Sequence, residues 1–274
     1  MFFGGPNSHK SYMSTKLGKF EFNKIYCGDC LKLLKDIPDN SIDLVIADPP
    51  FAIDFKGKRT NYHRTPGRVI EGYNEIPKEK YFDFSVQWMK ESFRILKDSG
   101  SMYCFSGWTN LKEILMAIDE VGFKVINHLI WKYQFGVFTK RKFVTSHYHI
   151  PVCVKNEKKY KFNKNEHYPE DVIYIKREYW TGKVKTPNKL PVALVAKLIQ
   201  FSTNEGDVVL DPFMGSGTTA VACKLLKRHF IGFEVVPEYV KLANRRLTGE
   251  RLEVSKKLIK KEETRLLQLF KTPV

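Results

Sequence analysis

The sequence predicts an α/β fold in which helices cover both faces of a mostly parallel sheet. The first observation is that, from Phe20 onward, short apolar runs alternate with amphipathic stretches of helical period. The second is a glycine-rich turn at residues 211–217, between a strand-like and a helix-like segment. The chain of 274 residues is long enough to bury the core of one large domain or two small ones.

In the first half of the chain, the elements follow from the apolar runs. Residues 42–47 read IDLVIA, which is typical of a buried strand, and Pro49 and Pro50 end it. Residues 81–96 place their large apolar side chains on one helical face. We expect strands at 24–27, 42–47, 101–105, 125–132 and 151–154, and helices at 31–36, 81–96 and 111–120.

The second half continues the alternation. We expect helices at 191–202, 218–226 and 237–247, and strands at 207–210 and 230–233. Pro237 suits the first turn of its helix. The chain therefore divides into a flexible arm at 1–19, a main domain at 20–250 and a basic helix at 251–274. The main domain contains a long loop at 52–80 and a polar, basic insertion at 155–185. That last helix is either a solvated surface helix or a contact for phosphates.

The charge balance points to a polyanionic partner. Lys and Arg number 46 against 30 Asp and Glu, a net charge of +16. Nucleic acid is the leading partner and an anionic membrane surface is the competitor. No apolar run is long enough to span a bilayer, and the start lacks the apolar core of a secretory signal. Five cysteines do not form a disulfide pattern, so we expect a reducing, cytoplasmic environment.

The glycine-rich turn is typical of a nucleotide-like cofactor site. The segment from Asp211 to Gly217 reads DPFMGSG, so the backbone can approach a ligand at the start of a helix. Glu234 ends the next strand, where an acid accepts hydrogen bonds from ribose hydroxyls. The phosphate-binding patterns GxGxxG and GxxxxGK[ST] are absent, and Asp211 favours a cationic ligand such as S-adenosylmethionine. The alternative is a tight turn without a ligand.

A second motif, Asp48-Pro49-Pro50-Phe51, follows the strand at 42–47. Its carboxylate and carbonyl oxygens accept hydrogen bonds, which suits a substrate with N–H donors such as an exocyclic amine. Phe51 is placed to stack on a planar ring. The alternative is a turn in which the two prolines only terminate the strand.

Together the two motifs resemble the DNA amino-methyltransferases, which methylate adenine N6 or cytosine N4. Their catalytic tetrapeptide has the form [DNS]-P-P-[YFW], and their cofactor loop the form D-P-F-x-G-S-G-T-T. The catalytic motif comes first here, as in the circularly permuted β group of the family. The segments CGDCL at 27–31, Phe143 to His147, and TPNKLP at 186–191 also fit. The last of these departs from the family's H-P-T-Q-K-P, and His147-Tyr148 from its His-Glu.

The resemblance implies a Rossmann-like methyltransferase fold whose mostly parallel sheet has an antiparallel hairpin at one edge. It also implies S-adenosylmethionine as cofactor, no metal, and direct methyl transfer to a flipped-out base. Asp48 and the Pro49 carbonyl would accept the N–H groups of the amine, with Pro50 shaping the turn and Phe51 stacking on the base. The cofactor-binding residues carried over from the family are Asp29, Cys30, Thr186, Lys189, Asp211, Phe213, Gly215, Ser216, Gly217, Thr218 and Glu234.

The implied macromolecular partner is double-stranded DNA. Residues 124–186 hold 14 Lys and Arg against five Asp and Glu, and the family places a target-recognition region near 155–185. We expect DNA contacts from the loop at 52–80 and from the insertion, at Lys56, Lys58, Arg59, Arg64, Arg68, Lys158, Lys159 and Lys161. The resemblance also allows a homodimer, a cognate restriction endonuclease and a place at the nucleoid in a prokaryotic cytoplasm.

Several alternatives stay open. The initial Asp of the tetrapeptide favours adenine N6, with cytosine N4 as the alternative. A catalytically inactive nucleic-acid-binding module and an RNA or protein amino-methyltransferase are further alternatives. The pair Cys27 and Cys30 is compatible with half a zinc site or a redox pair. His147 and His149 lie two residues apart on an expected strand. They are either structural or catalytic histidines.

Overall fold

The computed structural model describes residues 15–50, 76–136, 139–178 and 189–248, together with residues 255, 257, 260 and 261. In this part of the chain, eight strands form one sheet in the order β3-β10-β9-β4-β5-β7-β6-β8. The strands are β3 (Lys24–Cys27), β4 (Ile42–Ala47), β5 (Leu96–Cys104), β6 (Lys124–Lys132), β7 (His147–Val154), β8 (Val172–Tyr174), β9 (Val208–Asp211) and β10 (His229–Glu234). The neighbours from β3 to β5 are parallel, β7 is antiparallel to β5 and β6, and β8 is parallel to β6.

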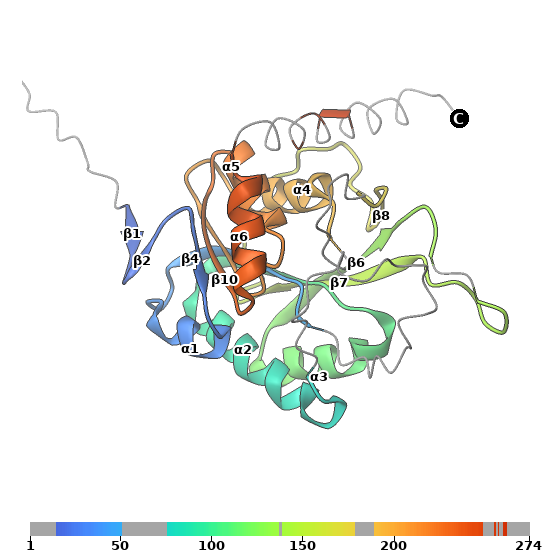
Figure 1. Cartoon of the computed structure of the whole chain (residues 1–274). Coiled ribbons are helices and arrows are strands. Elements are labelled where there is room, and N and C mark those ends of the chain that lie inside the picture. Colours follow the sequence, from blue (N-terminus) through green and yellow to red (C-terminus); the bar gives the residue numbers. More distant parts are fainter. Residues whose placement is uncertain are drawn as a thin grey trace, which may run out of the picture.

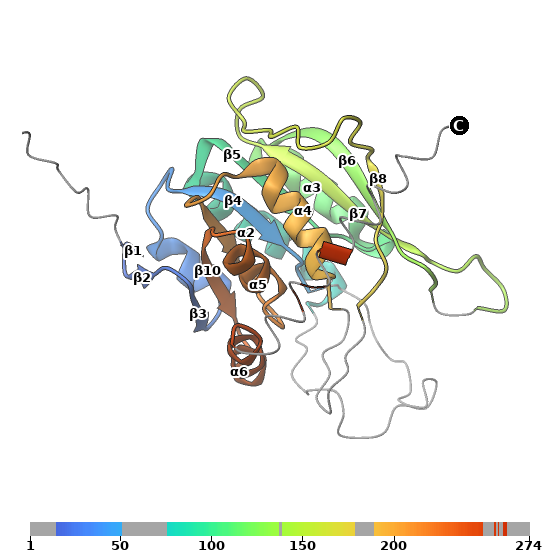
Figure 2. The same ribbon diagram turned by 90° about the horizontal axis from the view of Figure 1, so that it is seen from above.

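Helices cover both faces of the sheet (Figures 1 and 2). One face carries α1 (Cys30–Leu33), α2 (Tyr81–Ile95) and α3 (Leu111–Val121), and the other α4 (Val192–Ser202), α5 (Thr218–Leu225) and α6 (Pro237–Arg246). Short 3-10 turns are η1 (Leu34–Asp36), η3 (Lys78–Lys80) and η4 (Trp108–Asn110), and a small hairpin pairs β1 (Lys16–Leu17) with β2 (Phe20–Glu21). No helix in the described part is long and apolar enough to cross a membrane.

The central strand β4 explains why the sheet is covered twice. All six of its residues are buried, because Leu44 and Ile46 pack toward α4 and α5 while Val45 and Ala47 pack toward α2 and α3. Burying such side chains stabilises the fold by about 1.5–3 kcal/mol each. The polar exception is Asp43, which accepts hydrogen bonds from Lys97 Nζ at 2.9 Å and from the Val208 backbone N–H at 3.0 Å.

The α/β class, the mostly parallel sheet and the antiparallel hairpin are confirmed. Two strands are longer than expected: β5 begins at Leu96, directly after α2, and β7 begins at His147, where polar residues pair with β6. The expected arm at 1–19 is described only from residue 15, and there it already holds β1. The insertion at 155–185 contains β8, because Val172–Tyr174 adds to the exposed edge of β6.

Strand direction divides the molecule into two edges. The parallel strands β3, β10, β9, β4 and β5 all finish at one edge, the carboxyl edge, and begin at the opposite amino edge. Since β7 runs antiparallel, it delivers the chain after Val154 to the amino edge. There the Lys161 backbone N–H donates to the Ser99 carbonyl at 3.0 Å, and the Asn163 side chain donates to the Thr203 carbonyl at 2.8 Å.

Candidate active site

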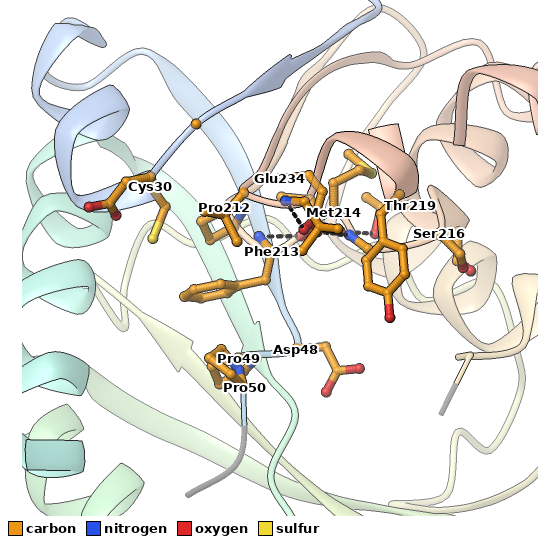
Figure 3. A pocket seen from close by; sticks show the side chains of 18 of the residues that line it. Cys30, Asp48, Pro49, Pro50, Pro212, Phe213, Met214, Ser216, Thr219 and Glu234 are labelled. Atoms are coloured by element: carbon orange, nitrogen blue, oxygen red, sulfur yellow. Dashed lines mark hydrogen bonds between the residues drawn. The ribbon is translucent and has the colours of Figure 1, made fainter. Parts of the chain in front are cut away.

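The carboxyl edge surrounds a cavity of about 400 Å³. Its walls come from the ends of β4, β9, β10 and β3 and from the residues before α4, which places the two sequence motifs in one site. Figure 3 shows Asp48, Pro49 and Pro50 on one side of this cavity and Glu234 on the other. A cavity of this size is in the range that holds a nucleoside-sized ligand.

The glycine loop depends on two left-handed backbone positions. Gly215 has φ 51° and Gly217 has φ 81°, conformations that side chains rarely adopt. A Cβ on Gly217 would also lie 2.6 Å from the Ala243 Cβ, because α6 packs tightly beneath the loop. Arg246, also on α6, donates to the Ser216 carbonyl at 2.7 Å and to the Thr218 hydroxyl at 3.1 Å. Helix α6 therefore fixes the shape of the loop.

Asp211 organises this loop from within. Its two carboxylate oxygens accept hydrogen bonds from the Phe213 backbone N–H at 2.9 Å and from the Thr219 hydroxyl at 2.6 Å. Burial raises the pKa of Asp211 to about 7, although these two hydrogen bonds oppose the shift. The carboxylate thus serves the loop itself, and each oxygen keeps a second acceptor position for a ligand.

Glu234 lies across the loop from Asp211. It accepts the Gly215 backbone N–H at 2.8 Å and the Val236 backbone N–H at 2.8 Å. Burial raises its pKa, and the backbone donors partly offset this. The side chain is therefore held in one orientation at the end of β10, with acceptor capacity left over.

Asp48 lies at the end of the central strand and lines the same cavity. Burial and the nearby Asp211 carboxylate raise its pKa to about 8. In residues 15–50, 76–136, 139–178 and 189–248, no group donates a hydrogen bond to its carboxylate, in contrast to Asp211 and Glu234. This acid is therefore positioned to hold or accept a proton near neutral pH.

A basic group forms the wall before α4. Lys189 lines the cavity, and its ammonium lies 2.5 Å from a carboxylate oxygen of Glu178. The other oxygen of Glu178 accepts the Val192 backbone N–H at 2.6 Å, which caps the start of α4. Burial lowers the pKa of Lys189, and Glu178 partly opposes the shift. Glu178 thereby fixes where the lysine sits.

The opposite wall is formed by α1 and α2. Asp29 caps α1 by accepting the Leu31 backbone N–H at 3.0 Å, and the Cys30 thiol lines the cavity. Burial raises the pKa of Cys30 to about 12, so this thiol stays protonated. Phe213 points between Cys30 and Pro49 (Figure 3) and packs edge-on against Trp88 with ring centroids 5.3 Å apart.

The structure brings most of the expected site residues together. The described members that line the cavity are Asp29, Cys30, Asp48, Pro49, Pro50, Lys189, Asp211, Phe213, Gly215, Ser216, Thr218 and Glu234. Gly217 lies in the same loop, as the residue before α5. Phe51, Thr186, Lys56, Lys58, Arg59, Arg64 and Arg68 lie outside the described residues.

The expected DNA contacts of the insertion are not brought to this site. Lys159 pairs with Asp98 at 2.9 Å, Lys161 pairs with Asp207, and both acids lie where their strands begin, at the amino edge. Lys158 lies on the same turn, where its backbone N–H donates to Asn156. The three lysines are therefore at the opposite end of the sheet from Asp48, because β7 runs antiparallel.

Sequence reasoning missed three contributors to the site. Glu178 and Arg246 position other residues, and Tyr239 lines the cavity from α6. Arg246 sits in a charged stretch, NRRL, whose pattern gives no sign that this arginine is buried. Tyr239 lies in the helix that follows Glu234. Its closeness in sequence to that acid was the only indication that it could line the site.

Comparisons with known proteins agree with this geometry. A family model described as DNA methylase matches residues 42–245. The type II methyltransferase M.HpaI of Haemophilus parainfluenzae is 32% identical over 246 residues, covering 83% of this chain and 74% of that protein. The type II methyltransferase M.HinfI of Haemophilus influenzae is 33% identical over 244 residues, covering 82% and 68%.

Solved structures show the same fold. The complex of M1.HpyAVI with SAM has a TM-score of 0.64 and 30% sequence identity, covering 82% of this chain and 99% of that one. The cytosine-N4-specific PvuII DNA methyltransferase has a TM-score of 0.67 at 23% identity, covering 86% and 90%. At that identity, the second structure supports the fold alone.

Proposed function

The chain belongs to the DNA methylase family, and from this membership we propose that it transfers a methyl group from S-adenosylmethionine to an exocyclic amine of a flipped-out DNA base, with adenine N6 favoured. It is an S-adenosylmethionine-dependent DNA methyltransferase of the N6/N4 type. The observation that carries the proposal is that Asp48 and the glycine loop line one cavity.

The cavity's side chains fit the cofactor. The cofactor supplies an electrophilic methyl group on a sulfonium. Asp29 and Cys30 would flank its adenine, Glu234 would accept the ribose hydroxyls, and the glycine loop would hold its methionine end. Lys189 is a cation in the same wall and suits a carboxylate. The acids Asp48, Asp211 and Glu234 favour a ligand with net positive charge.

Asp48 has the chemistry that the amine requires. An exocyclic amine is a weak nucleophile because its lone pair is delocalised into the ring. Hydrogen bonds from its N–H groups to Asp48 and to the Pro49 carbonyl localise that lone pair on nitrogen. The raised pKa of Asp48, about 8, suits a group that takes a proton as positive charge develops on the nitrogen.

The target base follows from the first residue of the tetrapeptide. Asp48 favours adenine N6, and cytosine N4 is the second candidate, because both amines present the same N–H donors to the same acceptors. The PvuII enzyme, which is cytosine-N4-specific, shares the fold and leaves both candidates in place. Identifying the modified base is therefore part of the test.

The experiment is methyl transfer from labelled cofactor to duplex DNA, RNA and protein in parallel. We expect label only in DNA, and digestion to nucleosides should place it on N6-methyladenine. Label on N4-methylcytosine would overturn the adenine assignment, and label confined to RNA or protein would overturn the DNA assignment. Sequencing the methylated DNA then gives the recognition site.

The wider setting is part of the same proposal. We infer association with the DNA of a prokaryotic cell, a cognate restriction endonuclease, and a homodimer. Type II methyltransferases among the relatives support the first two inferences. Light scattering of the purified protein tests the dimer, and a monomer with and without DNA would exclude it.

A further inference from the structure

The connection between β6 and β7 projects from the carboxyl edge. We call its described residues, 133–136 and 139–146, the β6–β7 arm. The Tyr133 backbone N–H donates to the Ser146 carbonyl at 3.0 Å, so the two sides of the arm stay paired beyond the strands. A Cβ on Gly136 would lie 1.8 Å from the Thr145 carbonyl oxygen, which shows how closely the two sides approach.

Strand register places this arm beyond the level of Asp48, on the side of the carboxyl edge. Ala47 is level with Cys104, and Ser106 bridges His149 two residues further along. The pair Lys132–His147 lies beyond that bridge, so the strands extend about 10 Å past the level of Asp48 before the arm begins. The arm therefore stands at the same edge as the cavity, two strands to the side of β4.

The arm combines positive charge with an uncovered aromatic ring. Lys140, Arg141 and Lys142 are exposed, and Phe143 is 99% exposed. No Asp or Glu occurs between Glu120 and Glu157 in the sequence. Beside three cations, an exposed aromatic ring suits a polyanion that also offers an apolar surface.

We propose that the β6–β7 arm docks on duplex DNA, with Lys140, Arg141 and Lys142 neutralising phosphates and Phe143 packing against base or sugar surface in a groove. This proposal rests on the proposed function, because it presumes that the target base enters the cavity beside Asp48. It assigns the DNA contacts of the region between Lys124 and the start of α4 to the arm instead of the amino edge, where Lys159 and Lys161 pair with acids of this chain.

The test compares two triple variants that remove the same charge. Lys140→Ala/Arg141→Ala/Lys142→Ala neutralises the arm, and the matched control Lys158→Ala/Lys159→Ala/Lys227→Ala neutralises exposed positions at the amino edge. Affinity for a methylatable duplex is measured from 50 to 300 mM salt. The slope of log affinity against log salt should flatten by about 2.7 in the arm variant, since each lost phosphate contact removes about 0.9. The control should keep the wild-type slope to within about 0.5.

Phe143→Ala tests the aromatic contact. It should weaken duplex affinity by about tenfold without changing the salt slope, whereas Phe143→Tyr should restore most of the affinity. Unchanged affinity in Phe143→Ala would overturn the groove contact.

Two further readouts separate this proposal from the proposed function. Cofactor affinity should be unchanged in every variant, and the arm variant should recover methyl transfer at saturating DNA. A wild-type enzyme that methylates DNA while both triple variants keep its salt slope would overturn the arm alone. Absence of methyl transfer by the wild type to any DNA would overturn the proposed function instead.

Discussion

The two edges of the sheet differ in whether their acidic side chains form ion pairs. At the amino edge, acids and bases neutralise one another: Lys97 lies 2.9 Å from Asp43, Lys159 lies 2.9 Å from Asp98, and Lys161 pairs with Asp207. At the carboxyl edge, none of the described Lys or Arg side chains forms an ion pair with Asp48, Asp211 or Glu234. The same strands thus begin in balanced charge and end in unbalanced charge.

The difference shows which charges this chain uses for stability and which for chemistry. A carboxylate paired with a lysine can have a lowered pKa, as Asp98 does beside Lys159, and then contributes to folding when it is ionised. A carboxylate that is largely shielded from water and has no cation beside it has a raised pKa, as Asp48 and Asp211 do, at about 8 and about 7. Such groups oppose folding when ionised and are kept where a cationic ligand will arrive.

The largest expected effect is loss of catalysis on changing Asp48. Asp48→Asn should reduce the rate of methyl transfer by about 10²–10⁴, because the amide cannot accept the proton. Cofactor affinity, measured by calorimetry, should stay within a few fold of wild type. Near-normal turnover in this variant would mean that another group is the base. The matched change at the amino edge, Asp43→Asn, should leave the chemical rate unchanged in the folded enzyme.

The next effect concerns the glycine loop. Gly217→Ala should weaken cofactor affinity by tenfold or more, since a strained backbone position costs about 1–3 kcal/mol and the new Cβ meets Ala243. Gly206, at the amino edge, also has a positive φ, of 85°, and an added Cβ there would meet nothing within 4 Å. Gly206→Ala is therefore a control that should lose some stability and keep full cofactor affinity. Equal cofactor affinity in the two variants would contradict the loop's role.

An intermediate effect is pH dependence. A base whose pKa is about 8 is ionised in only a small fraction of molecules at pH 6, so kcat/KM should rise about tenfold per pH unit below pH 8. Asp211, with a pKa of about 7, titrates beside it and should steepen the lower part of the profile. The profile is measured from pH 5.5 to 9.5 with wild type and Asp48→Asn. A flat wild-type profile would show that Asp48 is already ionised in the free enzyme.

The smallest effect is on stability, and it has opposite signs at the two edges. Folded Asp48 keeps its proton up to about pH 8, whereas the pKa of an exposed Asp is 3.8, so between these limits stability falls as pH rises. Asp48→Asn removes this loss and should stabilise the fold at pH 8.5 by about 1–3 kcal/mol. Asp43→Asn should destabilise it by about 1–3 kcal/mol, because Lys97 and the Val208 N–H lose a charged acceptor. Denaturant unfolding measures the change in unfolding free energy of both variants. Changes of the same sign would contradict the difference between the two edges.

Much of the carboxyl edge could be predicted from the sequence. Residues 42–47 and 208–211 lie in buried, mostly apolar strands. The two motifs at the ends of these strands indicate a site for an amine substrate and a site for a cofactor. The family resemblance implied that the two motifs serve one methyl-transfer reaction, and the carboxyl ends of the parallel strands bring them to one edge. Glu178 and Arg246 were not predictable in this way, since they act through long-range contacts with Lys189 and Ser216.

The position of the three lysines of the insertion follows from strand direction. The region 155–185 was expected to contact DNA because it is basic and because the family resemblance places a target-recognition region there. Since β7 is antiparallel, the chain leaves it at the amino edge and returns to the carboxyl edge only through β8. The expected hairpin already contained this reversal, so following strand direction through it places Lys158, Lys159 and Lys161 at the amino edge.

The pairing of β3 with β10 has a consequence for how the protein is made. β3 comes early in the chain and β10 is the latest of the described strands to be synthesised, yet they are neighbours, and the Gly28 N–H donates to the Glu234 carbonyl at 2.9 Å. Asp29 and Cys30 are therefore synthesised well before β10, the strand that completes the cavity beside them. Cofactor capture is thus a late event of biosynthesis, and a nascent chain arrested before residue 229 should not retain S-adenosylmethionine.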